Sequence, residues 1–103
     1  MNKIDINKLN FESIHFNETH GYTIYYLIDV ADVPKEISTK YVGFDKFTLS
    51  VEVFCDELIV QISPAKLLPD DIWVDYNYED YTGFEEKEIE DLLALTQKQI
   101  NKR

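Results

Sequence analysis

The segment FTLSVEVFCDELIVQIS, residues 47–63, decides the fold. Apolar and polar residues alternate on both sides of Cys55 and Asp56, which is the period-two pattern of half-buried strands. If these two residues form the loop, three apolar pairs share one face: Leu49 with Ile62, Val51 with Val60, and Val53 with Leu58. A shift by one residue would turn one apolar set to the other face, so the segment predicts an antiparallel hairpin in this register.

A second hairpin precedes this one in the chain. FESIHF, residues 11–16, and YTIYYLIDV, residues 22–30, both read as strands and flank NETHG, whose Asn17 and Gly21 are typical turn residues. The second of these strands carries apolar residues on both of its sides. We therefore expect it to lie inside the sheet, between two neighbouring strands.

Connections and one more strand complete the predicted sheet. Residues 31–46 contain a proline and a glycine and predict a long connection with a helical turn near residues 34–38. The segment 63–71 is bracketed by prolines and predicts another connection. IWVDYNY, residues 72–78, alternates again and predicts a fifth strand at an edge of the sheet.

The C-terminal segment predicts an amphipathic helix. Thr82 and Glu85 have the spacing of a capping box, and early acidic and late basic residues suit the helix dipole. From Phe84 onward, apolar residues that would bury one helix face recur at helical intervals: Ile89, Leu92, Leu93 and Ile100. The sequence thus predicts an α+β fold, in which a mainly antiparallel sheet of about five strands carries this helix on one face.

The composition predicts one packed domain spanning residues 1–103. Hydrophobic residues make up 45% of the chain, and there are only three glycines and three prolines, which excludes a disordered tail. The lone Cys55 cannot form an internal disulfide, the first residues lack the apolar core of a secretory signal, and no apolar run approaches ~18 residues. We therefore expect a cytoplasmic protein that does not enter a membrane.

The formal net charge of −10 is concentrated in one stretch. Residues 70–91 contain ten carboxylates and a single basic residue, Lys87. This charge opposes binding to nucleic acid and to anionic membranes, and it favours a basic partner. The helix dipole accounts only for glutamates in the first helical turn, at ~0.3–1 kcal/mol each. The rest of the charge is either a solubility device or a binding surface.

Aromatic residues in the same stretch favour a binding surface. Trp and Tyr anchor protein interfaces, and the aromatic rings of so short a segment cannot all be core. We expect Asp75, Glu79 and Asp80 to lie in turns or to face solvent. The predicted binding residues are Asp70, Asp71, Trp73, Asp75, Tyr76, Tyr78, Glu79, Asp80, Tyr81, Glu85 and Glu86.

The best metal-like spacing in the chain is incomplete. Asp75, Asn77, Glu79 and Glu86 match part of a calcium-loop pattern. Asp80, however, occupies the position where the sharp turn of such a loop needs glycine. The spacing is better explained by a strand, a turn and a helix start that are rich in acids.

His15, His20 and Cys55 are the remaining candidates for chemistry. They are too few for a zinc site without added carboxylates, and Asp56 and Glu57 beside the thiol would raise its pKa and oppose a nucleophilic role. Phosphate-binding loops and a nucleophile elbow are absent from the sequence. We predict no catalytic residue, no metal ligand and no cofactor, and a protein that is not an enzyme.

Two functions from different classes fit these observations. The first is a small acidic binding protein that engages a basic protein site, such as that of a nucleic-acid-binding enzyme, and inhibits it by acting as a nucleic-acid mimic. Immunity, anti-restriction and anti-CRISPR proteins work in this way, and the likeness is one of class only. The alternative is a structural or assembly protein that self-associates through a sheet edge, with the acids serving solubility.

Overall fold

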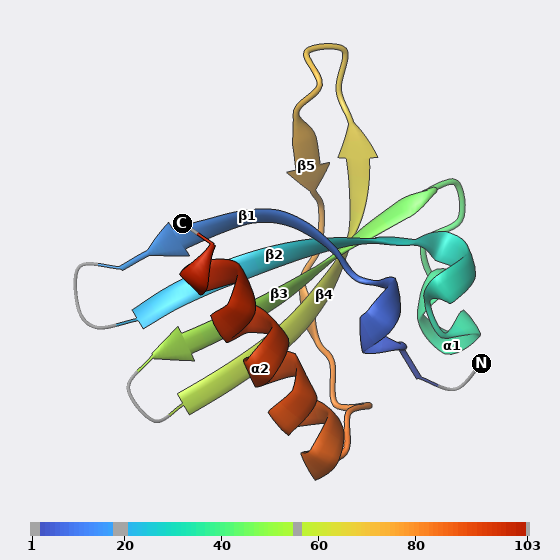
Figure 1. Cartoon of the computed structure of the whole chain (residues 1–103). Helices are drawn as coiled ribbons and strands as arrows, with labels where there is room; N and C mark the ends of the chain where they lie inside the picture. The colour runs from blue at the N-terminus through green and yellow to red at the C-terminus, as the bar shows by residue number, and fades with distance from the viewer. Residues whose placement is uncertain (1–2, 18–20, 55–56, 103) are drawn as a thin grey trace.

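The fold is an antiparallel sheet with a C-terminal helix, which confirms the predicted α+β class (Figure 1). The computed structural model describes residues 3–17, 21–54 and 57–102. The strands are β1 (Asn10–Phe16), β2 (Gly21–Asp29), β3 (Lys46–Phe54), β4 (Glu57–Leu67), β5 (Trp73–Asp75) and β6 (Glu79–Asp80). They lie in the order β1-β2-β3-β4-β5, and β6 also pairs with β4. The helical segments are η1 (Ile6–Lys8), η2 (Val30–Asp32), α1 (Lys35–Ser38) and α2 (Glu86–Asn101).

The predicted register of the β3–β4 hairpin is confirmed. The paired residues are Leu49 with Ile62, Val51 with Val60, and Val53 with Leu58. Leu49, Val51 and Ile62 are almost completely buried, because this apolar face forms the floor of the core. The loop predicted at residues 55 and 56 lies outside the described residues.

The β1–β2 hairpin and the position of β2 are also as predicted. β2 pairs with β1 along one edge and with β3 along the other, so it lies inside the sheet. The predicted helical turn is α1, where Ile37 is buried against the core. Of the predicted turn between β1 and β2, residues 18–20 lie outside the described residues.

The prediction of a connection over residues 63–71 is wrong at its start, because β4 continues through Pro64 to Leu67. Proline lacks an N–H group and is tolerated in a strand only where no ladder bond is lost. The carbonyl of Pro64 accepts a hydrogen bond from the N–H of Tyr76 at 3.1 Å, so its backbone faces away from β3. The ring therefore removes no β3–β4 hydrogen bond, and the hairpin extends past it.

The predicted strand over residues 72–78 is split in two. β5 and β6 both pair with β4, and residues 76–78 between them form a loop. β4 with β5 makes an arm that extends away from the rest of the sheet (Figure 1). Alternation of apolar and polar residues therefore predicted the strand type and its edge position but not the break.

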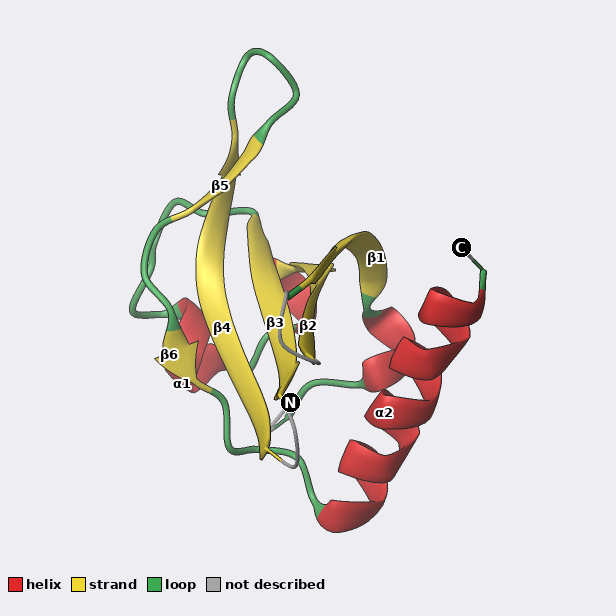
Figure 2. Cartoon of the chain, turned by 90° about the vertical axis from the view of Figure 1, so that its left-hand side faces the viewer, coloured by secondary structure: helices red, strands yellow, loops and turns green. Residues whose placement is uncertain are grey.

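Helix α2 lies along one side of the sheet (Figure 2). Leu92 and Thr96 are fully buried there, and Ile89 and Leu95 pack against the core at its margin. The hydroxyls of Tyr26 and Thr96 form a buried hydrogen bond at 3.1 Å, which links the helix to β2. Leu93, predicted to be buried, is 36% exposed because Leu92, Leu95 and Thr96 define the inward face.

The start of α2 differs from the predicted Thr82–Glu85 capping pair. The helix begins at Glu86, and the carboxylate of Glu88 accepts a hydrogen bond from the N–H of Glu85 at 2.9 Å. The helix starts late because Phe84 is drawn into the core, where its ring packs edge-on against Tyr81 with centroids 4.9 Å apart. Of the helices in the described ranges, none is long and apolar enough to span a membrane.

Candidate binding surface

The acidic segment does not form one continuous patch. Asp70 and Asp71 are exposed at the turn that joins β4 and β5, at the tip of the arm (Figure 1). Glu85 and Glu86 are exposed at the start of α2, at the opposite end of the molecule. Asp80, also exposed, lies in β6 between these ends. The structure therefore separates acids that are neighbours in the sequence.

A polar pocket lies on the face of the sheet opposite α2. Tyr26 bonds to α2, so its neighbour Tyr25 points to the other face. The pocket has a volume of about 210 Å³ and is lined by Glu12, Ser13, His15, Tyr25, Thr48, Trp73 and Asp75. Only Trp73 and Asp75 belong to the predicted binding residues, and four strands contribute to the lining.

A β-bulge in β1 directs Glu12 into this pocket. Phe11 pairs with Tyr26 and Ser13 pairs with Tyr25, so Glu12 is an extra residue without a partner in β2. A bulge bends a strand and re-aims side chains, and here both Glu12 and Ser13 line the pocket. Phe11 and Ile14 lie on the same face of the sheet, the one that carries Tyr26 and Ile24, although they are three residues apart. Residues on one face of a regular strand are an even number apart, so this odd spacing of apolar residues is the sequence signal of the bulge.

Asp75 lies at the centre of the pocket's hydrogen bonds. The hydroxyl of Thr48 donates to its Oδ1 at 2.6 Å, and the hydroxyl of Tyr78 donates to its Oδ2. Asp75 lies in β5 and not in a turn, and its side chain is partly exposed. Both donors are neutral, which leaves its negative charge without compensation from them.

The pocket carries a negative field. Burial, and then the charge of Asp75, raise the pKa of Glu12. Burial, followed by the charges of Asp75 and Glu52, raises the pKa of Tyr25, and burial with the hydrogen bond to Asp75 raises that of Tyr78. None of the ion pairs among the described residues includes Glu12, Glu52 or Asp75. The pocket therefore suits a cationic group.

This field predicts that Glu12→Gln stabilises the protein at neutral pH. A raised carboxyl pKa means that the ionised form opposes folding, so stability falls as pH rises through the folded pKa of Glu12. The gain should disappear below about pH 4.3, where glutamate is protonated in the unfolded chain too. Urea unfolding of the wild type and the variant, at neutral pH and below about pH 4.3, checks this. A variant that is less stable than the wild type at neutral pH would contradict it.

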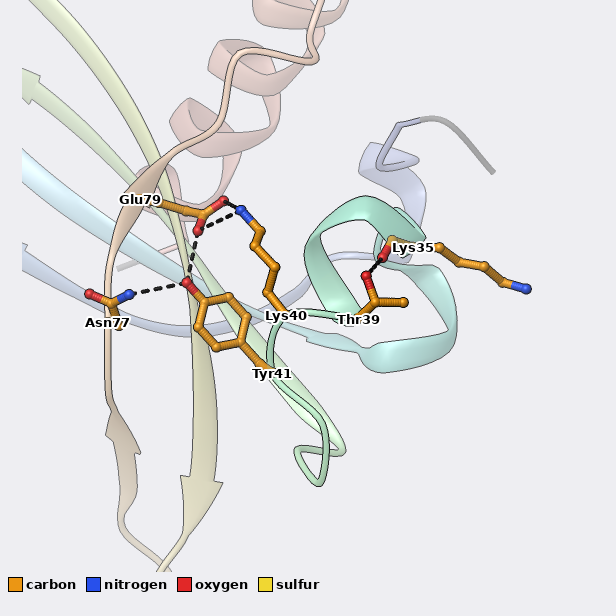
Figure 3. A network of polar contacts seen from close by, with 6 residues as sticks. All are labelled: Lys35, Thr39, Lys40, Tyr41, Asn77 and Glu79. Carbon is orange, nitrogen blue, oxygen red and sulfur yellow. Dashed lines mark hydrogen bonds and ion pairs between the residues drawn. The ribbon is translucent and has the colours of Figure 1, made fainter.

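Glu79 is held by a separate polar network (Figure 3). Lys40 Nζ lies 2.9 Å from its Oε1, and the hydroxyl of Tyr41 donates to its Oε2 at 2.8 Å. The amide of Asn77 in turn donates to the Tyr41 hydroxyl at 3.1 Å. The hydrogen bonds from Lys40 and then Tyr41 lower the pKa of Glu79. Glu79 thus lies in a strand and not in a turn, is partly exposed, and ties β6 to the connection after α1.

Tyr81 belongs to the core and offers almost no surface to a partner. It is 8% exposed, and its hydroxyl accepts a hydrogen bond from the N–H of Ile4 at 2.9 Å. The ring is packed so closely against Gly83 that a Cβ added there would lie 2.4 Å from the Tyr81 hydroxyl oxygen. Tyr76 and Tyr78, in contrast, are exposed, and Tyr76 stacks edge-on against Phe44 at 5.3 Å.

Gly83→Ala should therefore destabilise the fold by about 1–3 kcal/mol, since overpacking forces Tyr81 away from Ile4. Thr82→Ala, at the exposed neighbouring position, is the control and should change stability by less than about 0.5 kcal/mol. Urea denaturation measures both. Equal stability of the two variants would mean that the Tyr81 ring adapts at no cost.

Within the described ranges, no group of three or more His, Cys, Asp or Glu residues is arranged to hold a metal ion. His15 packs edge-on against Tyr25 with ring centroids 5.6 Å apart, whereas His20 and Cys55 lie outside the described residues. The hydroxyls, carboxylates and rings of the pocket can accept hydrogen bonds and bind a cation.

Comparisons with protein-family models, with curated protein sequences and with solved structures find no match for this chain.

Proposed function

We propose that this protein is a non-enzymatic, cytoplasmic binding protein that takes a basic side chain of a partner protein into the pocket around Asp75. The observation that carries the proposal is the pair of carboxylates, Glu12 and Asp75, which face one pocket without an ion-pair partner in the described part of the chain. Asp75 is partly buried and Glu12 is exposed beside it. Two neighbouring carboxylates without a counter-ion repel each other, and a bound cation would relieve that repulsion.

The size and walls of the pocket favour a single arginine. Its volume of about 210 Å³ is below the ~300–1,000 Å³ typical of sites for drug-sized molecules. Trp73 and Tyr25 supply aromatic surface, on which a guanidinium stacks more readily than an ammonium. Carboxylate acceptors beside these rings complete a site for a planar cation.

The partner we propose is a basic protein whose own site binds nucleic acid. Asp70, Asp71, Glu85 and Glu86 are exposed and spread over the molecule, so they add long-range attraction to the short-range contacts of the pocket. Occupation of a nucleic-acid site by this surface would exclude the nucleic acid and thereby inhibit the partner. Direct binding of nucleic acid by a chain with a charge of −10 is disfavoured.

Self-association through a sheet edge is the weaker alternative. β1 lies at one end of the strand order, but the bulge at Glu12 interrupts the regular ladder that edge pairing needs. An edge that carries a carboxylate also repels its own copy.

A pull-down at low and at high salt, with identification of the captured protein, tests the proposal. We expect a protein with a basic surface that is captured by the wild type and by the control pair Glu36→Gln with Asp45→Asn. The pocket pair Glu12→Gln with Asp75→Asn should capture much less of it. High salt should weaken capture, since attraction between exposed charges is screened. Capture that depends neither on salt nor on the pocket would refute the proposal.

A further inference from the structure

The N-terminal half of β4 has a free edge. The carbonyls of Val60 and Pro64 accept hydrogen bonds from the N–H groups of Tyr81 and Tyr76, at 2.9 and 3.1 Å. The even-numbered residues of β4 therefore direct their backbone groups away from β3, because N–H and C=O of one strand residue point to the same side. Leu58, which is also even-numbered, points its N–H and C=O in this direction.

None of the strands in the described part of the chain covers this part of the edge. β6 pairs with β4 only at Gln61 and Ile62, and after Tyr81 the chain turns away toward α2 (Figure 2). Among the described residues, the N–H and C=O of Leu58 and the N–H of Val60 have no backbone partner. These three backbone hydrogen-bonding groups are thus open to a further strand.

An apolar groove lies beside the open positions. Its volume is about 430 Å³, which is within the range of ligand sites, and its walls include Leu58, Val60, Phe84 and Ile89. Its rim is acidic, because Asp80 lines it and forms no ion pair within the described residues. An unpaired strand edge, an apolar groove and an acidic rim therefore coincide.

We propose that this groove binds an extended segment of a partner protein, which adds a strand to the edge of β4. Such a segment would carry an apolar side chain toward Phe84 and Ile89 and a lysine or arginine near Asp80. A second copy of this chain is the less suitable occupant, since it brings the same carboxylates and a net charge of −10. The groove shares no lining residue with the pocket around Asp75, so this inference stands or falls independently of the function proposed above.

A short acetylated and amidated peptide of alternating lysine and valine is the probe, and amide hydrogen exchange is the readout. In the free protein, the amides of Leu58 and Val60 should exchange faster than those of Ile59 and Gln61, which face β3. With saturating peptide, exchange at Leu58 and Val60 should slow by at least about tenfold. Slow exchange of both amides in the free protein would show that the edge is already covered and would overturn the inference.

Two controls separate strand addition from attraction by charge. The same peptide with alternate backbone nitrogens methylated keeps its charges and side chains, and it should bind at least about tenfold more weakly. Leu58→Pro removes the open N–H without removing a β3–β4 bond, as Pro64 already does in the same strand, and should weaken the unmethylated peptide similarly. Equal binding of the two peptides, or protection at Leu58 and Val60 that appears only with protein dimerisation, would overturn the proposal.

Discussion

Val51→Asp is expected to unfold most of the protein or to cost roughly 3–5 kcal/mol of stability. Val51 is fully buried at the centre of β3, where it pairs with Ile24 of β2 and with Val60 of β4. A carboxylate at this position has no cation or hydrogen-bond donor from a side chain of these neighbours, so its charge would be buried without compensation. The loss is comparable with the total stability of a domain of this size, and urea unfolding followed by circular dichroism measures it.

Val42→Asp is the matched control, because the same substitution is made at a side chain that is 87% exposed. It should change the free energy of unfolding by less than about 0.5 kcal/mol. Ser50, the neighbour of Val51 on the other face, is a poor control since it is only 6% exposed. Similar losses for both valine variants would show that Val51 does not lie in the core and that the β3–β4 register is wrong.

The second large effect is expected on binding. Glu12→Gln together with Asp75→Asn should weaken binding of the basic partner by about a hundredfold. The loss of each close charge pair costs about 1.4 kcal/mol or more, and each 1.4 kcal/mol is tenfold in Kd. Both substitutions keep the shape of the side chain. The asparagine oxygen can still accept from one of the two hydroxyls, that of Thr48 or Tyr78, and the amide nitrogen can donate to the other. Calorimetric titration of the identified partner with each variant measures the change.

Two controls carry the same change of net charge. The first control pair, Glu36→Gln with Asp45→Asn, changes two exposed acids outside the pocket around Asp75. The second, Glu86→Gln with Asp70→Asn, changes one exposed acid at the start of α2 and one in the turn between β4 and β5. We expect each control pair to weaken binding by less than about tenfold, through reduced steering alone. If all three pairs weaken binding equally, only net charge matters and the pocket has no special role.

The sequence predicted those parts of the fold that depend on local alternation. The register around residues 55 and 56 follows from three apolar pairs, and the central position of β2 follows from its two apolar faces. The sequence predicted the amphipathic helix but not every residue of its buried face. Thr96 was missed because it is polar and is buried only with the help of its hydrogen bond to Tyr26. A polar residue that is satisfied by a distant partner gives no local signal.

The continuation of β4 through Pro64 was not predicted for a similar reason. The effect of a proline on a strand depends on which side the missing N–H would face, and that side is set by register and not by the residue itself. Pro64 faces the gap between β5 and β6, where Tyr76 donates to its carbonyl. The hydrogen bond from Tyr76 to Pro64 therefore accompanies both differences from the prediction, the break between β5 and β6 and the extension of β4 past Pro64.

The candidate site was predicted only in part, because the sequence locates charges and the structure decides which of them are compensated. Glu79 is paired with Lys40, 39 residues away in the chain. Glu12, which lies in the first predicted strand, lines the same pocket as Asp75 because a bulge in β1 re-aims it. Residues of β1 and β5, the two ends of the strand order, line one pocket, and no local pattern in the sequence predicts this.

The fluorescence of Trp73 during titration with a hexa-arginine peptide tests the central claim most directly. Trp73 is the only tryptophan of the chain and lines the pocket around Asp75, so its emission is sensitive to a ligand bound there. We predict a saturable change of emission that the pocket pair Glu12→Gln with Asp75→Asn abolishes and the control pair Glu86→Gln with Asp70→Asn preserves. Calorimetric binding of the peptide to the wild type without any change at Trp73, or an equal change in both variants, would contradict a cation site at Asp75.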